Sequence, residues 1–212
     1  MFPIGDDNSD RRTIPVVTYA LIAFNVLFFL VELGGGDAFI RAWSFVPVRF
    51  LAHPTGDFVT IFSSMFMHAG WLHLGGNMLY LWIFGDNVED RFGHLPFLAF
   101  YLACGIAATF AQLAFSLGSD ILHLGASGAI AGVLGAYLLL FPNHRVTVVA
   151  GYGIMQVSAL VVIGLWFVLQ LFSGVGSLGA AADTGGVAFM AHIGGFITGC
   201  VLAIILRGNR VA

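Results

Sequence analysis

The 212-residue sequence contains no lysine and few charged residues of any kind. Asp, Glu and Arg together make up 9% of the chain, whereas roughly 25% is usual in soluble domains. The formal net charge is −3. The chain therefore has no basic patch that could hold a phosphate backbone, and a nucleic-acid-binding protein is excluded. The two cysteines, Cys104 and Cys200, lie in apolar segments, where small buried side chains are expected rather than a disulfide framework.

Hydrophobic residues are what the sequence has in excess. They account for 59% of the chain, and the mean hydropathy is +0.95, whereas a soluble domain contains about 45–50% apolar residues. A soluble fold of this length cannot bury so much apolar surface. The composition therefore predicts an all-α integral membrane protein that crosses the bilayer several times.

Six apolar segments are candidates to cross a bilayer, which takes about 20 residues of helix. They span about residues 15–33, 68–85, 95–117, 127–141, 147–172 and 188–206. We expect a six-helix membrane domain over residues 15–206. Residues 1–14 are expected to form a cytoplasmic N-terminal segment, and residues 207–212 a cytoplasmic C-terminal tail.

The arginines predict the orientation of these segments. With the N-terminus inside, six of the eight arginines fall on the cytoplasmic side: Arg11, Arg12, Arg91, Arg145, Arg207 and Arg210. Arg41 and Arg49 fall outside, in the long loop over residues 34–67. This distribution follows the positive-inside rule. We expect a bacterial plasma membrane protein with both termini in the cytoplasm.

The fourth apolar segment is short. From Ser127 to Phe141 it holds 15 residues, or about 22 Å of helix, which is less than the ~30 Å hydrocarbon core. A helix that ends below the membrane surface needs protein or water around its free N–H groups. We therefore expect Ser127 to lie on the floor of a water-filled cavity that opens to the outer face.

Strongly polar side chains cluster near the outer ends of the second, fourth and sixth segments. They are His68, His73 and Asn77 in the second, Ser127 in the fourth and His192 in the sixth. Because polar groups at membrane depth cost free energy, each of them is a candidate functional residue.

Ser127 and His192 each have a structural and a chemical interpretation. Ser127, in a Gly-Ala-Ser-Gly sequence, could simply cap a helix, and His192 could be a buried histidine bonded to a carbonyl group. A neutral histidine ~3 Å from the serine hydroxyl would instead activate the serine as a nucleophile. No Asp or Glu lies within the fourth or the sixth segment, so the only version of this chemistry is a Ser–His dyad.

His73 and Asn77 are four residues apart and share one face of a helix. They could form an interhelical hydrogen bond, or they could donate hydrogen bonds to an oxyanion. As zinc ligands the pair is poor, and no metal site is expected. Glycines spaced by four would let the fourth and sixth helices approach closely. These glycines are Gly128, Gly132, Gly195 and Gly199.

Taken together, the chain resembles the rhomboid family of intramembrane serine proteases. The resemblance extends from about residue 13 to residue 206. It rests on the serine motif at residues 125–128, the histidine motif at residues 191–195, residues 67–77 of the second segment and a Glu-x-Arg sequence at residues 89–91. It implies a six-helix rhomboid-like bundle in which Ser127 is the nucleophile and His192 the general base.

The resemblance also implies roles for the other polar residues. The N–H of Ser127 would form the oxyanion hole with His73 and Asn77, while His68 and Gly125 would support the cavity. Glu89 and Arg91 would pin a cytoplasmic loop, the alternative being an exposed ion pair of little energetic weight.

The implied substrates are single-pass transmembrane proteins, cleaved near the outer end of their span. They would reach the site between the second and fifth segments of the bundle. No cofactor, metal or nucleotide is implied.

The chain departs from the family pattern at two places, of which only the first concerns the catalytic residues. Family members often carry an aromatic residue four positions after the serine, on which the imidazole stacks, but this chain has Ala131. Some also carry a Trp-Arg pair in the first outer loop, which residues 34–67 lack. The alternative functions are a catalytically silent rhomboid-like protein that binds membrane clients, and a small transporter in which the histidines relay protons.

Overall fold

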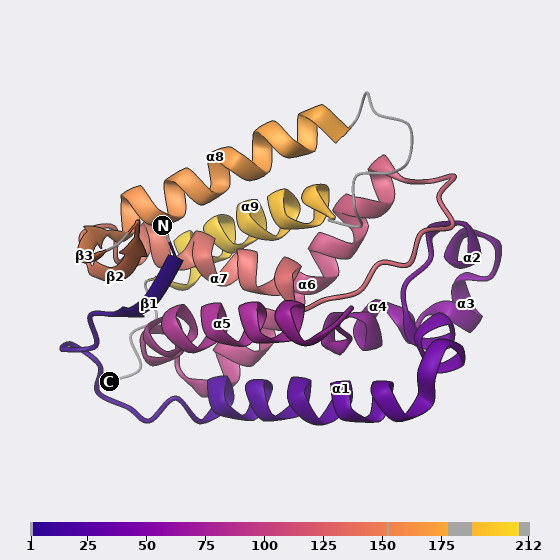
Figure 1. The fold of residues 1–212 in the computed structure, drawn as a ribbon, viewed down its shortest axis with the longest axis horizontal. Coiled ribbons are helices and arrows are strands. Elements are labelled where there is room, and N and C mark those ends of the chain that lie inside the picture. Colours follow the sequence, from indigo (N-terminus) through magenta and orange to yellow (C-terminus); the bar gives the residue numbers. More distant parts are fainter. Residues whose placement is uncertain (1, 152, 178–187, 208–212) are drawn as a thin grey trace.

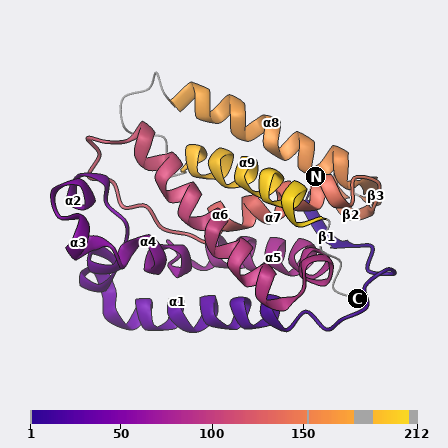
Figure 2. The same cartoon turned by 180° about the vertical axis from the view of Figure 1, so that it is seen from behind.

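The structure is a computed structural model that describes residues 2–151, 153–177 and 188–207. Within these residues there are five long helices and a shorter one that lies among them (Figure 1). The long helices are α1 (Val16–Trp43), α5 (Trp71–Phe92), α6 (His94–Phe115), α8 (Ala159–Ser177) and α9 (Phe189–Leu206), and the shorter one is α7 (Ser127–Leu140). In both views, α1 and α8 lie on opposite edges of the bundle (Figures 1 and 2).

Short helices join α1 to α5. They are α2 (Pro47–Ala52), α3 (Pro54–Asp57), α4 (Thr60–Ser63) and the 3-10 turn η1 (Ser64–Phe66). The first helix is longer than predicted, because it continues to Trp43 across a kink at Gly36, whose φ is 59° and ψ −158°. Glycine adopts this backbone conformation without the steric cost of a Cβ atom.

Helix α7 lies at the centre because its side chains are small and apolar. Every residue from Gly128 to Tyr137 is buried. Helix α7 packs most extensively on α9, and α6 packs on both. A Cβ atom at Gly195 would collide with the carbonyl oxygen of Gly128, and one at Gly199 with that of Gly132. The backbones of α7 and α9 are therefore in direct contact at these glycines.

A three-stranded antiparallel sheet lies at the end of the bundle where the chain begins (Figure 1). Its strands, in order, are β1 (Phe2–Asp6), β2 (Arg145–Ala150) and β3 (Gly153–Ser158). The described chain is therefore mostly helical, as predicted, but it also contains a small sheet that the all-α prediction did not include. The predicted fifth segment over residues 147–172 is wrong in its first half, since α8 begins only at Ala159.

The physical reason for this error is visible in the sequence of the hairpin. Residues 146–149 are all β-branched, which favours a strand over a helix. The two strands pair in register from Arg145 with Ser158 to Ala150 with Gly153. Gly151, which follows β2, has a φ of 59°, a left-handed conformation that suits a tight reversal of the chain.

Four helices in the described part of the chain are long and apolar enough to cross a membrane: α1, α6, α8 and α9. Helix α7 is apolar but has only 14 residues, in keeping with the short fourth segment of the prediction. Helix α5 has 22 residues, but side chains such as His73, Asn77 and Asp86 lower its hydropathy. The predicted count of six spans thus rests on treating α5 and α7 as spans too.

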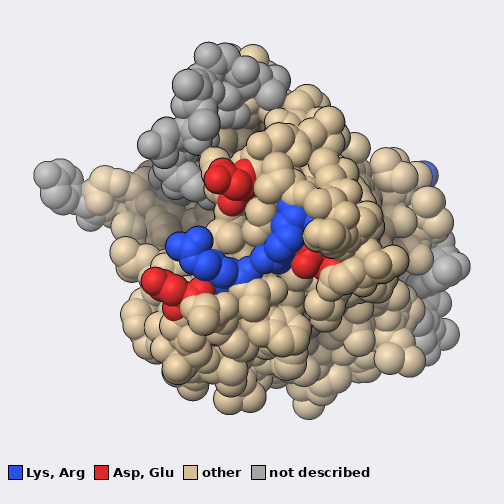
Figure 3. All heavy atoms as spheres, turned by 90° about the vertical axis from the view of Figure 1, so that its right-hand side faces the viewer, with Lys and Arg blue, Asp and Glu red and all other residues tan. Residues whose placement is uncertain are grey.

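The outer surfaces of the helices are strongly apolar. Many large hydrophobic side chains are exposed, and Leu72, Leu95 and Phe172 are 94%, 77% and 75% exposed. Soluble proteins rarely expose large continuous apolar surfaces. Charged side chains are also sparse at the end of the molecule formed by α2 and α3 (Figure 3). There, the guanidinium of Arg49 pairs with the carboxylate of Asp57 at 2.6 Å.

Glu89 holds the beginning of α1. Its carboxylate is fully buried and accepts hydrogen bonds from the N–H groups of Val17 and Thr18 at 2.9 and 2.7 Å, and from the Thr18 hydroxyl at 2.7 Å. A negative charge at these N–H groups is favoured because the first turn of a helix has no internal acceptors for them. The alternative of an exposed ion pair is therefore wrong for Glu89. The side chain of Arg91 donates to the carbonyl of Arg207 at 2.8 Å, which ties α5 to the end of α9.

Asp6, at the end of β1, connects the sheet to the helices. Its carboxylate accepts hydrogen bonds from the Tyr137 hydroxyl and the Asn87 amide, both at 2.7 Å. Burial raises the pKa of Asp6 to about 7, and the nearby Asp86 carboxylate adds to the rise. The protonated form of Asp6 is thus favoured in the folded chain.

We predict that Gly199→Ala strongly destabilises the fold. The new methyl group would have to push α9 away from α7, and overpacking of this kind costs about 1–3 kcal/mol or more. Thermal unfolding in detergent measures the effect. Gly164→Ala on α8 is the matched control, because a methyl group added there would meet no other atom within 4 Å. Equal unfolding temperatures for the two variants would contradict the close contact of α7 with α9.

We also predict that Asp6 makes stability depend on pH. Because its pKa is raised from 3.8 to about 7 on folding, the folded chain binds the proton more tightly, and this stabilisation is lost as pH rises from about 4 to about 7. Thermal unfolding of wild type and Asp6→Asn at pH 5 and pH 8 tests this. The wild type should lose more stability between the two pH values than the variant, and parallel losses would refute the assignment.

Candidate active site

Ser127 begins α7, two residues after a glycine with a positive φ. Gly125 has a φ of 131°, and its N–H donates to the carbonyl of Ser64 at 2.8 Å, which anchors this loop to η1. The first intrahelical hydrogen bond of α7 runs from the N–H of Ile130 to the carbonyl of Ala126 at 3.0 Å. The N–H groups of Ser127 and its two successors therefore precede the helical hydrogen-bond ladder and point out of the helix end.

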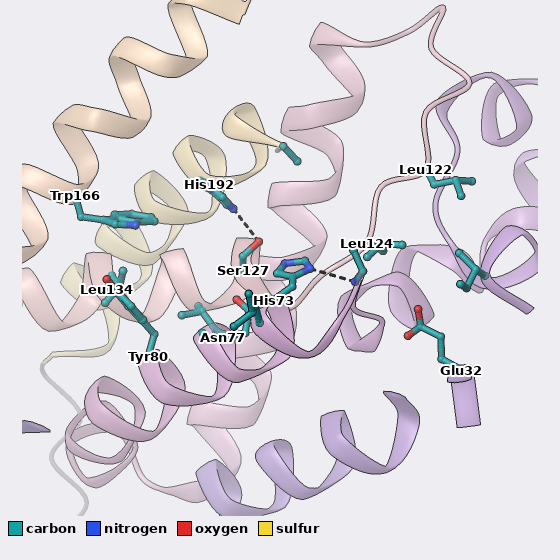
Figure 4. A pocket seen from close by; sticks show the side chains of 16 residues that line it. Glu32, His73, Asn77, Tyr80, Leu122, Leu124, Ser127, Leu134, Trp166 and His192 are labelled. Carbon is teal, nitrogen blue, oxygen red and sulfur yellow. Dashed lines mark hydrogen bonds between the residues drawn. The ribbon is translucent and has the colours of Figure 1, made fainter. Parts of the chain in front are cut away.

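The structure brings Ser127 and His192 together. Nε2 of His192, from α9, lies 2.8 Å from the Ser127 hydroxyl oxygen, which α7 supplies (Figure 4). At this distance the hydroxyl can donate its proton to Nε2 when the imidazole is neutral and carries its own proton on Nδ1. The side chains are 65 residues apart in the sequence. They meet because the helix backbones touch at Gly128, which follows Ser127, and at Gly195, three residues after His192.

His73 and Asn77, both from α5, face the same cavity as Ser127 (Figure 4). The N–H of Ala69 donates to Nδ1 of His73 at 3.3 Å, which leaves the proton of a neutral ring on Nε2. The amide nitrogen of Asn77 is buried and, within the described residues, has no hydrogen-bond partner. Two N–H donors of α5 are thus free to serve a group that enters the cavity.

The absence of a side chain at Gly125 also leaves room for the ring of His73. A Cβ atom at this position would lie 2.9–3.0 Å from the ring of His73 and 3.6 Å from the Ser127 hydroxyl oxygen. Any other residue would therefore push the imidazole away from the serine. The missing side chain lets His73 approach Ser127 from the α5 side.

His68 lies behind His73 and does not line this cavity. Its side chain is 1% exposed, and its ring packs edge-on against that of His73, with the centroids 5.1 Å apart. Its backbone N–H donates to the Glu32 carboxylate at 3.0 Å. Neither ring nitrogen of His68 has a hydrogen-bond partner among the described residues.

The cavity has a volume of about 770 Å³ and is lined by residues from α1, α5, α7, α8 and α9 and from the loop before α7. Its wall is mostly apolar, with Leu72, Tyr80, Ile130 and Leu134 among its lining residues. Such a cavity can hold a short extended peptide segment beside the serine. The described residues contain no group of three or more side chains that could bind a metal ion.

The sequence of this chain matches that of a known protein family. The family model described as "Rhomboid domain" matches residues 55–209, which is most of the chain. The chain belongs to the rhomboid family. Together with its apolar helices, this membership makes it a multi-pass membrane protein.

Among the relatives of this rhomboid chain is the rhomboid protease GluP of Bacillus subtilis, 33% identical over 196 residues, which cover 91% of this chain and 35% of GluP. Another is the mitochondrial rhomboid protein 1 of Saccharomyces cerevisiae, 30% identical over 86% of this chain and 51% of that protein. A third is the RHOMBOID-like protein 5 of Arabidopsis thaliana, 27% identical over 71% of this chain and 45% of that protein. The chain thus spans about a third to a half of the length of these relatives.

The rhomboid site contains two side chains that sequence analysis missed, Gln170 and Trp166 of α8. Oε1 of Gln170 lies 2.7 Å from Nδ1 of His192, and the Trp166 ring lies 5.9 Å from the imidazole, tilted by 40°. Ala131, at the position where the family often has an aromatic residue, is buried in α7. A signal for Gln170 was present, because it is the one hydrogen-bonding amide in the apolar sequence of residues 159–172, and polar residues at membrane depth are functional candidates.

Proposed function

We propose that the chain is an intramembrane serine endopeptidase that hydrolyses peptide bonds with a Ser127–His192 dyad. The observation that carries the proposal is the 2.8 Å contact between the Ser127 hydroxyl oxygen and Nε2 of His192, at the start of α7, where the first N–H groups precede the helical hydrogen bonds. A base within hydrogen-bond distance of a serine is the arrangement that nucleophilic catalysis requires. The relative GluP, described as a rhomboid protease, supports the same chemistry.

In this mechanism the Ser127 oxygen attacks the scissile carbonyl carbon while Nε2 of His192 takes the hydroxyl proton. The negative charge that forms on the carbonyl oxygen is stabilised by the N–H of Ser127, Nε2–H of His73 and the amide of Asn77. The imidazolium then gives its proton to the leaving amine. Water, deprotonated by the same histidine, hydrolyses the acyl-enzyme and restores Ser127.

The site would be reached from the side, between α5 and α8. Both helices line the cavity, yet they hardly pack on each other. The substrate would be a single-pass transmembrane protein whose helix unwinds locally, because an intact helix shields its carbonyl groups from attack. Cleavage would occur near the outer end of the substrate's span, in a wet cavity at the outer face.

The topology that fits this proposal has six spans, α1 and α5 to α9, in a bacterial plasma membrane with both termini cytoplasmic. The described arginines support it. Those placed inside by the prediction are Arg11, Arg12, Arg91, Arg145 and Arg207, and those placed outside are Arg41 and Arg49. The pairing of Arg91 with the end of α9 is consistent with one shared cytoplasmic end.

The first test is labelling of the purified protein in detergent with a fluorophosphonate probe, which reacts with activated serines. Wild type should be labelled, whereas Ser127→Ala and His192→Ala should not be. Ser63→Ala is the matched control, because the Ser63 hydroxyl donates to the carbonyl of Trp43 at 2.6 Å, away from His192. Absence of labelling, together with absence of cleavage of a model transmembrane substrate, would favour a catalytically silent client-binding protein.

A second prediction concerns the oxyanion. Asn77→Ala should lower turnover by about one to three orders of magnitude while the fold is retained, because one preorganised donor is lost. Cleavage of a transmembrane substrate and thermal unfolding measure the two effects separately. Asn25→Ala is the control, since the Asn25 amide lies in α1 and donates to the carbonyl of Leu21 at 2.7 Å. Unchanged turnover for Asn77→Ala would remove Asn77 from the mechanism.

A further inference from the structure

His192 needs a partner that holds its ring, and α7 does not provide one. Ala131 is too small to stack on the imidazole, and its side chain is buried in the packing around α7. The side chains that meet the ring on the side away from Ser127 come from α8. The Gln170 amide oxygen accepts a hydrogen bond from Nδ1 at 2.7 Å. The ring of Trp166, one helical turn earlier, lies 5.9 Å from the imidazole, on the α8 side of the site (Figure 4).

The contact with Gln170 has a chemical consequence for the imidazole. A neutral histidine carries one proton, on either Nδ1 or Nε2, and the bond made by one nitrogen decides which. The carbonyl oxygen of Gln170, 2.7 Å from Nδ1, can only accept, so it draws the proton to Nδ1. The lone pair is then left on Nε2, which faces the Ser127 hydroxyl.

We propose that Gln170 is the positioning residue of the dyad: its amide oxygen orients His192 and holds it in the tautomer that can accept the serine proton. The inference rests on the proposed function of Ser127 and His192. Gln170 takes the role that a carboxylate has in a three-residue serine site, but it does so without burying a negative charge in an apolar helix. Because Gln170 belongs to α8, the base is held only while α8 stays packed on α9.

The test compares two substitutions at position 170. Gln170→Met keeps the length of the side chain but cannot accept a hydrogen bond, and Gln170→Glu keeps the acceptor and adds a charge. Gln156→Met, on the exposed strand β3, is the matched control. Two measurements report activity: the rate of fluorophosphonate labelling, and kcat and KM for a transmembrane substrate over a range of pH. The third is 15N NMR of histidine-labelled protein, in which the His192 signals are assigned by their loss in His192→Ala.

Gln170→Met should lower the labelling rate and kcat by about 10- to 100-fold, the range found when a metal-binding histidine loses the hydrogen-bond partner of its other ring nitrogen, with KM little changed. Gln170→Glu should recover activity, and the acid limb of its pH profile should move to higher pH, because the carboxylate stabilises the imidazolium. The other titratable groups lining the cavity, His73 of α5, Tyr80 of α5 and Glu32 of α1, are the same in all variants. The control should behave as wild type.

The NMR measurement separates this inference from the proposed function, since it needs no activity. Wild type should show His192 protonated at Nδ1, and Gln170→Met should lose this preference. A wild type with the Nδ1–H tautomer but no labelling or cleavage would overturn the protease proposal and leave the role of Gln170 standing. Wild-type activity with the other tautomer, or with a pH profile unmoved by Gln170→Glu, would overturn the role of Gln170, even where Gln170→Met fails to fold.

Discussion

The close contact between α7 and α9 is the constraint on which the rest of the structure depends. Lipid surrounds a membrane protein with apolar groups, so helices gain little hydrophobic free energy by associating and rely on van der Waals contact. Here, the backbones meet at Gly128 with Gly195 and at Gly132 with Gly199, where no side chain could be inserted. Helix α6 packs against both helices and encloses α7. The serine and the histidine stand 2.8 Å apart because these backbones can come so close.

Polar groups buried in this apolar chain serve different purposes. Some are fully paired and hold elements together, as when Glu89 binds the first turn of α1 and Asp6 joins the sheet to α7 and α5. Others, such as the amide nitrogen of Asn77, are buried without a partner among the described residues and face the cavity. Since an unpaired buried donor costs free energy, such a group suits a site that awaits a charge formed during a reaction.

Much of this arrangement could be predicted from the residues. The short fourth segment, the glycines at spacing four and the polar cluster of His73, Asn77, Ser127 and His192 all follow from hydropathy and side-chain chemistry. The start of the fifth segment could not be placed correctly from hydropathy, because a buried strand and a membrane helix can have equally apolar sequences. The buried role of Glu89 could not be predicted either, since its partners, Val17 and Thr18, lie more than seventy residues away.

The sequence by itself determined that this chain belongs in a membrane, which helices have residues small enough for close packing, and which polar side chains lie in its apolar segments. These properties are local, since they depend on composition, on spacing along a helix and on the polarity of single residues. Only the tertiary structure decided what orients His192. Gln170 lies on a different helix, 22 residues earlier in the chain, and its contact with the imidazole depends on how α8 packs against α9. No spacing along the chain encodes that packing.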